Sequence, residues 1–170
     1  MTMTTLLYIL IFLILATATY GALSSAPWLP TKKRDVKRMA DIADIKKGEI
    51  VYDLGCGDGR LIFAVARLGA KAIGIEVFIL PYLYACIKKI FYRNVVILYG
   101  DFFNYDISQA DVVMIFLMPK SYKKIIEKLA KELRPGSRVV VYCFEIEEWK
   151  NKLVKVDKED NQLQVYLYKV

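Results

Sequence analysis

The sequence predicts an α/β fold with a mostly parallel sheet, a C-terminal antiparallel hairpin and one N-terminal helix that crosses a membrane. Three observations lead to this prediction. Strand and helix patterns alternate from residue 50 to residue 144, and alternating β and α units form a parallel sheet with helices on both faces. Two strand-like segments follow this region, and a long uncharged segment precedes it.

The individual elements follow from apolar spacing and turn residues. Buried strands are expected at residues 50–54, 71–75, 95–99, 111–117 and 138–144. Helical spacing occurs at residues 61–68, 81–92 and 121–133. The tail alternates at residues 153–157 and 163–168 around a polar turn, which predicts the antiparallel hairpin.

The composition limits the size and partners of the fold. A chain of 170 residues supports one domain with a full-sized core. The hydrophobic fraction of 56% is concentrated near the N-terminus, which points to a membrane segment. The net charge of +7 indicates an anionic partner, either lipid head groups or nucleic acid. A solvated basic surface would explain that charge equally well.

The sequence holds few metal ligands. It has no histidine, so imidazole acid–base catalysis and histidine-containing metal sites are excluded. The three cysteines, Cys56, Cys86 and Cys143, have no C-x-x-C spacing. Neither a disulfide framework nor a zinc site is indicated, and we expect a reducing compartment and no bound metal.

The first 31 residues contain no charged side chain. About 20 apolar residues span the roughly 30 Å hydrocarbon core of a bilayer, so residues 1–25 are predicted to form a transmembrane anchor. A cleaved signal peptide is the main alternative, but no basic residue precedes Leu6, and Pro27 follows the small residues at 24–26. A buried helix of a soluble protein is the other alternative.

The charges beside this segment predict its orientation. Its N-terminal flank carries no Lys or Arg side chain. Five basic residues follow its C-terminal end, namely Lys32, Lys33, Arg34, Lys37 and Arg38. By the positive-inside rule, the rest of the chain lies on the cytoplasmic side. The same residues can attract anionic lipid. We therefore expect a single-pass membrane protein whose remaining domain lies on the cytoplasmic side.

Residues 26–48 are predicted to connect this anchor to the domain at 49–170. Pro27 and Pro30 prevent the membrane helix from continuing. Trp28 suits the level of the lipid head groups. Apolar residues at helical spacing from 35 to 45 then predict a short amphipathic helix that lies over the ligand site.

A glycine-rich turn connects the first strand of the domain to a helix. Gly55, Gly57 and Gly59 alternate there, Cys56 lies between the first two, and Asp53 precedes them by two positions. Backbone N–H groups and the absence of side chains let such a turn approach a nucleotide closely. The spacing resembles motif I of the Rossmann-like class I S-adenosylmethionine (SAM) methyltransferases. The resemblance implies a seven-stranded sheet and SAM as the cofactor.

Acidic residues follow the successive strands. Asp53 is expected to face the ammonium group of SAM, and Glu76, at the end of the second strand, to accept hydrogen bonds from both ribose hydroxyls. Asp101 follows the third strand, where contact with the adenine amino group is usual, and Phe102 can pack on the ring. The alternatives are an exposed strand end for Glu76 and an ordinary turn residue for Asp101.

The end of the fourth strand is predicted to reach the transferred methyl group. It reads Phe116-Leu117-Met118-Pro119, and in amino-methylating enzymes of this fold the loop here offers carbonyl groups to the incoming nitrogen. Transfer to a neutral nitrogen needs positioning and exclusion of water more than acid–base work. A lysine must first lose a proton; Asp101, Tyr142 and Glu145 are candidate bases by location only.

The motifs together resemble the family of the adenine nucleotide translocase and ATP synthase c-subunit lysine methyltransferases. They occur in the order Pro27-Trp28-Leu29-Pro30-Thr31, Asp53-Leu54-Gly55-x-Gly57-Asp58-Gly59-Arg60, Gly74-x-Glu76, Phe116-Leu117-x-Pro119 and Phe144…Trp149. The resemblance implies a membrane-anchored protein-lysine N-methyltransferase, with Trp28, Pro30 and Trp149 near the substrate or lid. Four apolar residues precede Pro81 where the family has a small polar residue, which predicts a longer or more apolar ribose-side loop.

The expected activity is methylation of a lysine on a membrane protein near the cytoplasmic face. A lipid or another small membrane-borne acceptor is the first alternative. A nucleic-acid methyltransferase is less favoured, because no basic stripe interleaved with aromatic residues occurs and the Asn-Pro-Pro-aromatic motif of amino-base enzymes is missing. No nucleic-acid partner is therefore expected.

Overall fold

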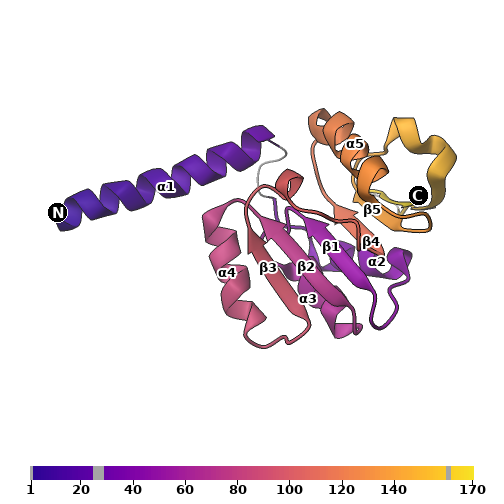
Figure 1. Ribbon diagram of the computed structural model, residues 1–170, viewed down its shortest axis with the longest axis horizontal. Coiled ribbons are helices and arrows are strands. Elements are labelled where there is room, and N and C mark those ends of the chain that lie inside the picture. The colour runs from indigo at the N-terminus through magenta and orange to yellow at the C-terminus, as the bar shows by residue number, and fades with distance from the viewer. Residues whose placement is uncertain (1, 25–28, 160–161) are drawn as a thin grey trace.

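The computed structural model describes residues 2–24, 29–159 and 162–170. Its seven strands form one sheet in the order β3-β2-β1-β4-β5-β7-β6 (Figure 1). They are β1 (Ile50–Leu54), β2 (Lys71–Glu76), β3 (Val95–Tyr99), β4 (Val112–Ile115), β5 (Arg138–Tyr142), β6 (Leu153–Asp157) and β7 (Val165–Lys169). The first five are parallel, and β7 pairs antiparallel with both β5 and β6. The predicted sheet with a C-terminal antiparallel hairpin is confirmed.

Helices cover both faces of the sheet (Figure 1). One apolar cluster joins the sheet to α2 (Lys33–Ala43), α3 (Arg60–Arg67) and α4 (Ile79–Lys89). The opposite cluster joins it to α5 (Tyr122–Glu132) and to two short 3₁₀ helices, η1 (Phe102–Asn104) and η3 (Glu147–Lys152). All four residues of β4 are buried, as expected for a central parallel strand that is covered on both faces.

Two strands end earlier than their apolar runs predict. The predicted strand at 111–117 stops at Ile115, because its neighbour β1 ends opposite it at Leu54 and turns into the glycine loop. The predicted strand at 138–144 stops at Tyr142, since Cys143 takes a positive φ of 83°. Both strands therefore release residues at the carboxyl edge of the sheet, where parallel α/β folds bind ligands.

The prediction of a longer loop after Glu76 is wrong in its length. α4 begins at Ile79, so only Val77 and Phe78 connect it to β2. Pro81 is the third residue of α4 and lies in its first turn, where a missing N–H costs no helical hydrogen bond. A helix can therefore start before the proline. The loop is apolar, as predicted, but short.

The N-terminal helix α1 (Met3–Ser24) projects from the domain (Figure 1). Within the described residues it is the one helix long and apolar enough to cross a membrane, as judged by length and composition. No residue of its segment Met3–Gly21 is fully buried in the protein, although Thr17, Ala18 and Gly21 are half-buried where α1 meets the domain. That α1 crosses a bilayer stays a prediction.

Candidate cofactor and methyl-transfer site

A cavity opens at the carboxyl ends of β1, β2 and β4. The glycine loop forms the floor of this cavity. The loop is held against β2 because the backbone N–H groups of Gly55 and Cys56 donate to the carbonyl oxygen of Ile75 at 2.9 and 3.0 Å. Gly55 has a φ of 85° and Gly57 a φ of 54°, a region that favours glycine. A Cβ on Gly55 would meet only the side chain of Leu117, at 4.0 Å. Apart from that contact, the Cβ would project into the open cavity. Glycine at this position therefore leaves room for a ligand.

Glu76 closes one side of the cavity. Its carboxylate accepts hydrogen bonds from the N–H groups of Gly57 and Phe78, both at 2.7 Å. Burial raises its pKa, while the backbone hydrogen bonds act in the opposite direction. Each carboxylate oxygen has a second lone pair. Glu76 is thus held rigidly and can still accept two hydroxyl groups of a ligand.

Asp53 lines the same cavity. The side chain is buried, and no donor among the described residues forms a hydrogen bond with its carboxyl group. Burial, with the negative charges of Glu76 and Asp58, raises the pKa of Asp53 to about 8. A buried carboxyl group with an unfavourable negative charge is suited to a cationic ligand group. The ammonium group of SAM fits this position.

Asp101 and Phe102 lie at the far end of the cavity, after β3. One oxygen of Asp101 accepts the N–H of Phe103 at 3.0 Å and caps η1. The other oxygen accepts the hydroxyl of Tyr20 at 2.7 Å. Phe102 is buried and presents an apolar surface next to this carboxylate. The pair combines a hydrogen-bond acceptor with a flat apolar wall, as an adenine ring requires.

The end of α1 forms part of the cavity wall, a contact that was not predicted from the sequence. Ala18 and Gly21 line the cavity, and a Cβ on Gly21 would lie 3.2 Å from the side chain of Val77. Small residues in the last turns of α1 therefore allow close approach to the domain. Ala18 and Gly21 were the available sequence signal, but their apolar surroundings indicated only a membrane segment.

The connector supplies another wall. Leu29, Pro30 and Thr31 line the cavity, and the Thr31 carbonyl accepts a hydrogen bond from Arg60 at 2.5 Å. Arg60 also pairs with Asp58 of the glycine loop at 2.7 Å. The structure therefore brings Pro30 to the wall of this cavity, and its role near a substrate stays a prediction. The helix predicted at 35–45 occupies Lys33–Ala43 and also contributes to the cavity. Trp28 and Pro27 lie outside the described residues.

The segment after β4 reaches the cavity only in part. Phe116 and Leu117 line it, and the Phe116 ring meets the Tyr142 ring edge-on with centroids 4.8 Å apart. Met118 and Pro119 are exposed and are not among the described lining residues. Two of the four predicted methyl-proximal residues are therefore brought to the cavity.

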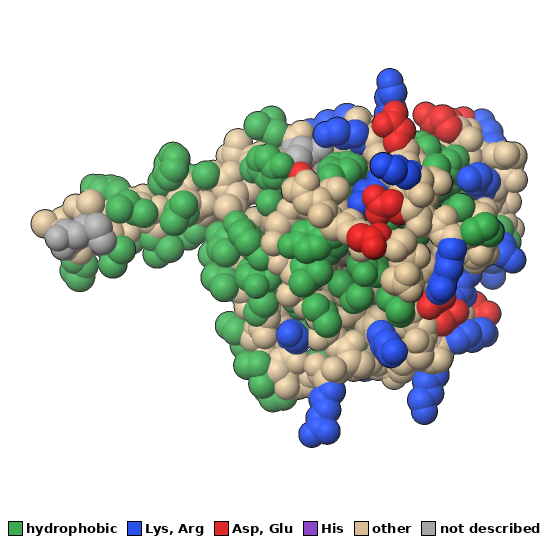
Figure 2. All heavy atoms as spheres, in the orientation of Figure 1, with side chains coloured by type: hydrophobic (Ala, Val, Ile, Leu, Met, Phe, Trp, Pro, Cys, Tyr) green, Lys and Arg blue, Asp and Glu red, His purple; other side chains and the backbone are tan. Residues whose placement is uncertain are grey.

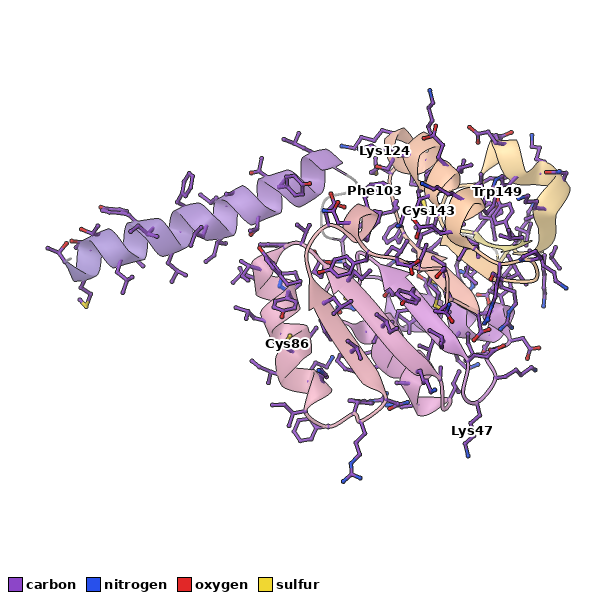
Figure 3. The ribbon with its side chains drawn as sticks, in the orientation of Figure 1. Lys47, Cys86, Phe103, Lys124, Cys143 and Trp149 are labelled. Carbon is purple, nitrogen blue, oxygen red and sulfur yellow. The ribbon has the colours of Figure 1, made fainter. Side chains whose placement is uncertain are left out.

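Trp149 lies away from the cavity, contrary to its predicted place near the lid. It is buried on the face of the sheet that α5 covers, with its ring 6.0 Å from that of Tyr168 (Figure 3). An aromatic residue that packs a core gives the same sequence signal as one that binds a substrate. Glu145 is likewise not among the described residues that line the cavity.

Tyr142 cannot serve readily as a base. Its hydroxyl donates to Asp35 at 2.7 Å, and Asp35 is paired with Arg38 at 3.1 Å. Burial and the hydrogen bond to Asp35 raise the pKa of Tyr142. The phenol therefore stays protonated at neutral pH, and its visible role is to join β5 to α2.

Comparisons with known proteins identify the family of this chain. Residues 53–153 match the ANTKMT methyltransferase domain. A protein-lysine N-methyltransferase of Saccharolobus islandicus is 41% identical over 148 residues, which cover 84% of this chain and 92% of the relative. The chain belongs to the ANTKMT methyltransferase family. It is a SAM-dependent methyltransferase of the class I fold, from a family of protein-lysine methyltransferases.

More distant relatives are also methyltransferases. The ATP synthase c-subunit lysine N-methyltransferase of Rattus norvegicus is 28% identical, and the match covers 72% of this chain but only 58% of that relative. An RNA methyltransferase from Salinibacter ruber, solved in complex with S-adenosyl-L-homocysteine, aligns with a TM-score of 0.77 and 32% identity. That alignment covers 83% of this chain and 93% of the other. SAM as cofactor is therefore confirmed.

Proposed function

We propose that this family member methylates the side-chain amine of lysines on a membrane protein, close to the cytoplasmic face of the bilayer. The observation that carries this proposal is the position of α1, whose last turns line the cofactor cavity while its remaining length projects as an uncharged apolar helix. An anchor so close to the cavity keeps the acceptor within reach of the membrane. The Saccharolobus and rat relatives are named lysine methyltransferases, which supports the acceptor class.

The charges beside α1 support the orientation. Lys32, Lys33, Arg34 and Lys37 follow the apolar segment, and no Lys or Arg side chain precedes it. The positive-inside rule then puts the catalytic domain in the cytoplasm. SAM is made there, so topology and cofactor supply agree.

We assign each of the cavity residues a role in binding SAM. Asp53 pairs with the ammonium group, Glu76 accepts the ribose hydroxyls, and Asp101 with Phe102 holds adenine. Gly55, Cys56, Gly57 and Gly59 shape the backbone that carries the methionine end. Cys56 contributes through its backbone, because its thiol packs against Gly74.

Phe116 and Leu117 are proposed to lie beside the reacting groups. Bound SAM supplies an electrophilic methyl group, and the acceptor amine must arrive uncharged. An apolar wall favours the uncharged amine, since burial disfavours a lysine ammonium. These residues and the connector with Pro30 also exclude water, and Trp28 is proposed to complete this lid. Positioning therefore accounts for most of the catalysis.

Incubation of membranes that contain the full chain with radiolabelled SAM tests the proposal. We expect label in membrane proteins, on lysine after hydrolysis. Label in the organic-extractable fraction would favour a lipid acceptor instead. RNA must also be tested, because the Salinibacter relative is named an RNA methyltransferase. Label in RNA alone would overturn the proposed acceptor.

A further inference from the structure

The outer face of α4 is an exposed apolar surface next to the anchor. Six large apolar side chains on α4 and its C-terminal extension are between 47% and 83% exposed, namely Leu80, Leu83, Tyr84, Ile87, Ile90 and Phe91. We call these six residues the α4 face. Their spacing puts them on one side of a helix, and Pro81 and Ala85 on the other side are buried against the sheet. The helix is thus apolar on both sides.

Another helix of this chain shows what an ordinary surface helix looks like. α5 buries Ile125 and Leu129 and exposes Lys123, Lys124 and Glu127 (Figure 3). Its outer side is therefore charged, in contrast to the α4 face. Exposed apolar patches on this scale mark a surface that contacts a partner or a membrane.

The α4 face is continuous with the apolar surface of α1. The two helices are in contact, and Thr17 of α1 lies with its hydroxyl 3.5 Å from the N–H of Ile79. α4 runs across the direction of α1, on the side of the domain from which α1 projects (Figure 1). Figure 2 shows apolar side chains of the domain on that side, beside the root of α1. A bilayer crossed by α1 would therefore meet α4 lying along its surface.

The length of α1 supports the same arrangement. Thr17, Ala18 and Gly21 are engaged with the domain, which leaves residues 3–16 free. This free part is about 21 Å long at 1.5 Å per residue, and the hydrocarbon core is about 30 Å thick. The difference of about 9 Å matches the roughly 5–10 Å to which interfacial helices bury their apolar faces. For the described part of α1, which begins at Met3, an α4 face at this depth makes up the difference.

The charges around α4 favour lipid as the occupant. Lys88 and Lys89 form its last turn, Arg93 follows, and residues 77–100 include no acidic side chain. Basic residues at the edge of an apolar face can contact anionic head groups. We propose that the α4 face lies in the headgroup region of the bilayer that α1 crosses. This inference rests on the membrane placement of α1 proposed above.

The position of α4 has a consequence for the acceptor. Val77 and Phe78 line the cofactor cavity and lead directly into α4. If α4 lies in the interface, the cavity opens at the membrane surface. The acceptor class is then a lysine at the membrane boundary of its protein, within reach of the head groups.

Depth measurement by nitroxide labelling tests the inference without using methyl transfer. The two partly exposed cysteines are replaced by Cys86→Ser and Cys143→Ser, and Cys56 is kept because it is buried and inaccessible to the label. The full chain is placed in vesicles of phosphatidylcholine and phosphatidylglycerol. Labels are introduced by Ile87→Cys on α4, by Phe12→Cys on α1, and by Val154→Cys as a matched control. Val154 is 60% exposed on β6, at the opposite edge of the sheet. SAM binding by each variant verifies the fold.

We expect oxygen to reach the label at 87 more often, and a water-soluble nickel chelate less often, than the label at 154. If the label at 12 is in lipid but the label at 87 behaves like that at 154, the inference is overturned and the anchor stands. A label at 87 shielded from both reagents would indicate a protein partner or a second copy and would also overturn it. Labels at 12 and 87 both in water would overturn the anchor and the inference together.

Discussion

At the scale of single residues, we predict that the buried carboxyl of Asp53 makes cofactor affinity depend on pH. Its pKa is raised to about 8, so in the ligand-free protein it stabilises the fold at acid pH, and this contribution is lost as pH rises from about 4 to about 8. The ammonium group of SAM favours the ionised form, so binding releases a proton. We expect affinity to rise by up to about tenfold between pH 6 and pH 7.

Calorimetry at those two pH values, in two buffers of different ionisation enthalpy, measures both the affinity and the proton release. Asp53→Asn is the matched control, because it removes the titrating group and keeps the shape. The variant should bind weakly with no such pH dependence. An equal pH dependence in both proteins would contradict the proposed role of Asp53.

Glu76 provides a second prediction at this scale. Glu76→Ala removes the acceptors proposed for the ribose and also the hydrogen bonds that the carboxylate accepts from the N–H groups of Gly57 and Phe78. A hydrogen bond to a charged group contributes roughly 1.5–3 kcal/mol, so SAM affinity should fall about tenfold or more. Glu127→Ala, at an exposed position on α5, is the control and should bind as the wild type does. Unchanged affinity in Glu76→Ala would argue against ribose binding there.

At the scale of elements, β2 must approach the glycine loop closely. A Cβ on Gly74 would lie 2.6 Å from the sulfur and 2.9 Å from the Cβ of Cys56. Gly74→Ala should therefore destabilise the protein by about 1–3 kcal/mol, as overpacking of a core does. Chemical denaturation measures this loss. Cys56→Gly in the same chain should restore part of it, and a double variant no more stable than Gly74→Ala would refute this contact as the cause.

The bond between Tyr20 and Asp101 joins α1 to the cofactor site. Tyr20→Phe removes it while retaining the ring, so the last turns of α1 should open more often. Hydrogen exchange of the amides at residues 17–24, in the full chain in a membrane, should become faster. Tyr8→Phe is the matched control, since Tyr8 lies on the free part of α1 and is exposed. Equal exchange rates in both variants would exclude this bond as a restraint on α1.

The elements differ in how far the sequence predicts them. β3 and β6 have the expected bounds, because their apolar pattern and flanking turns are local signals. The acidic residues at or near the carboxyl ends of β1, β2 and β3 were also predictable, since parallel strands end at one edge of the sheet. Trp149 was misplaced, and the contact of α1 with the cavity was missed. Both depend on tertiary packing, which produces no recognisable pattern in the sequence.

At the scale of the whole molecule, α1 and α4 present one apolar surface on the side of the cofactor cavity. A tether to the same membrane raises the effective concentration of an embedded acceptor. The orientation set by the α4 face would decide whether that acceptor meets the cavity. The proposal thus gives the two elements different roles: α1 would keep the enzyme at the membrane, and the α4 face would orient the cavity toward the acceptor.

A charged α4 face should therefore separate membrane-bound from soluble substrates. Ile87→Glu with Phe91→Glu adds charges where the domain is proposed to enter the interface and leaves the proposed anchor α1 unchanged. We expect kcat/KM to fall for a lysine close to the membrane in an embedded protein and to stay unchanged for a soluble lysine peptide. Val154→Glu with Leu163→Glu adds the same charge at exposed positions outside the α4 face and should change neither. An equal loss on both substrates would mean that the α4 variant harms the site itself, and the membrane would not be its cause.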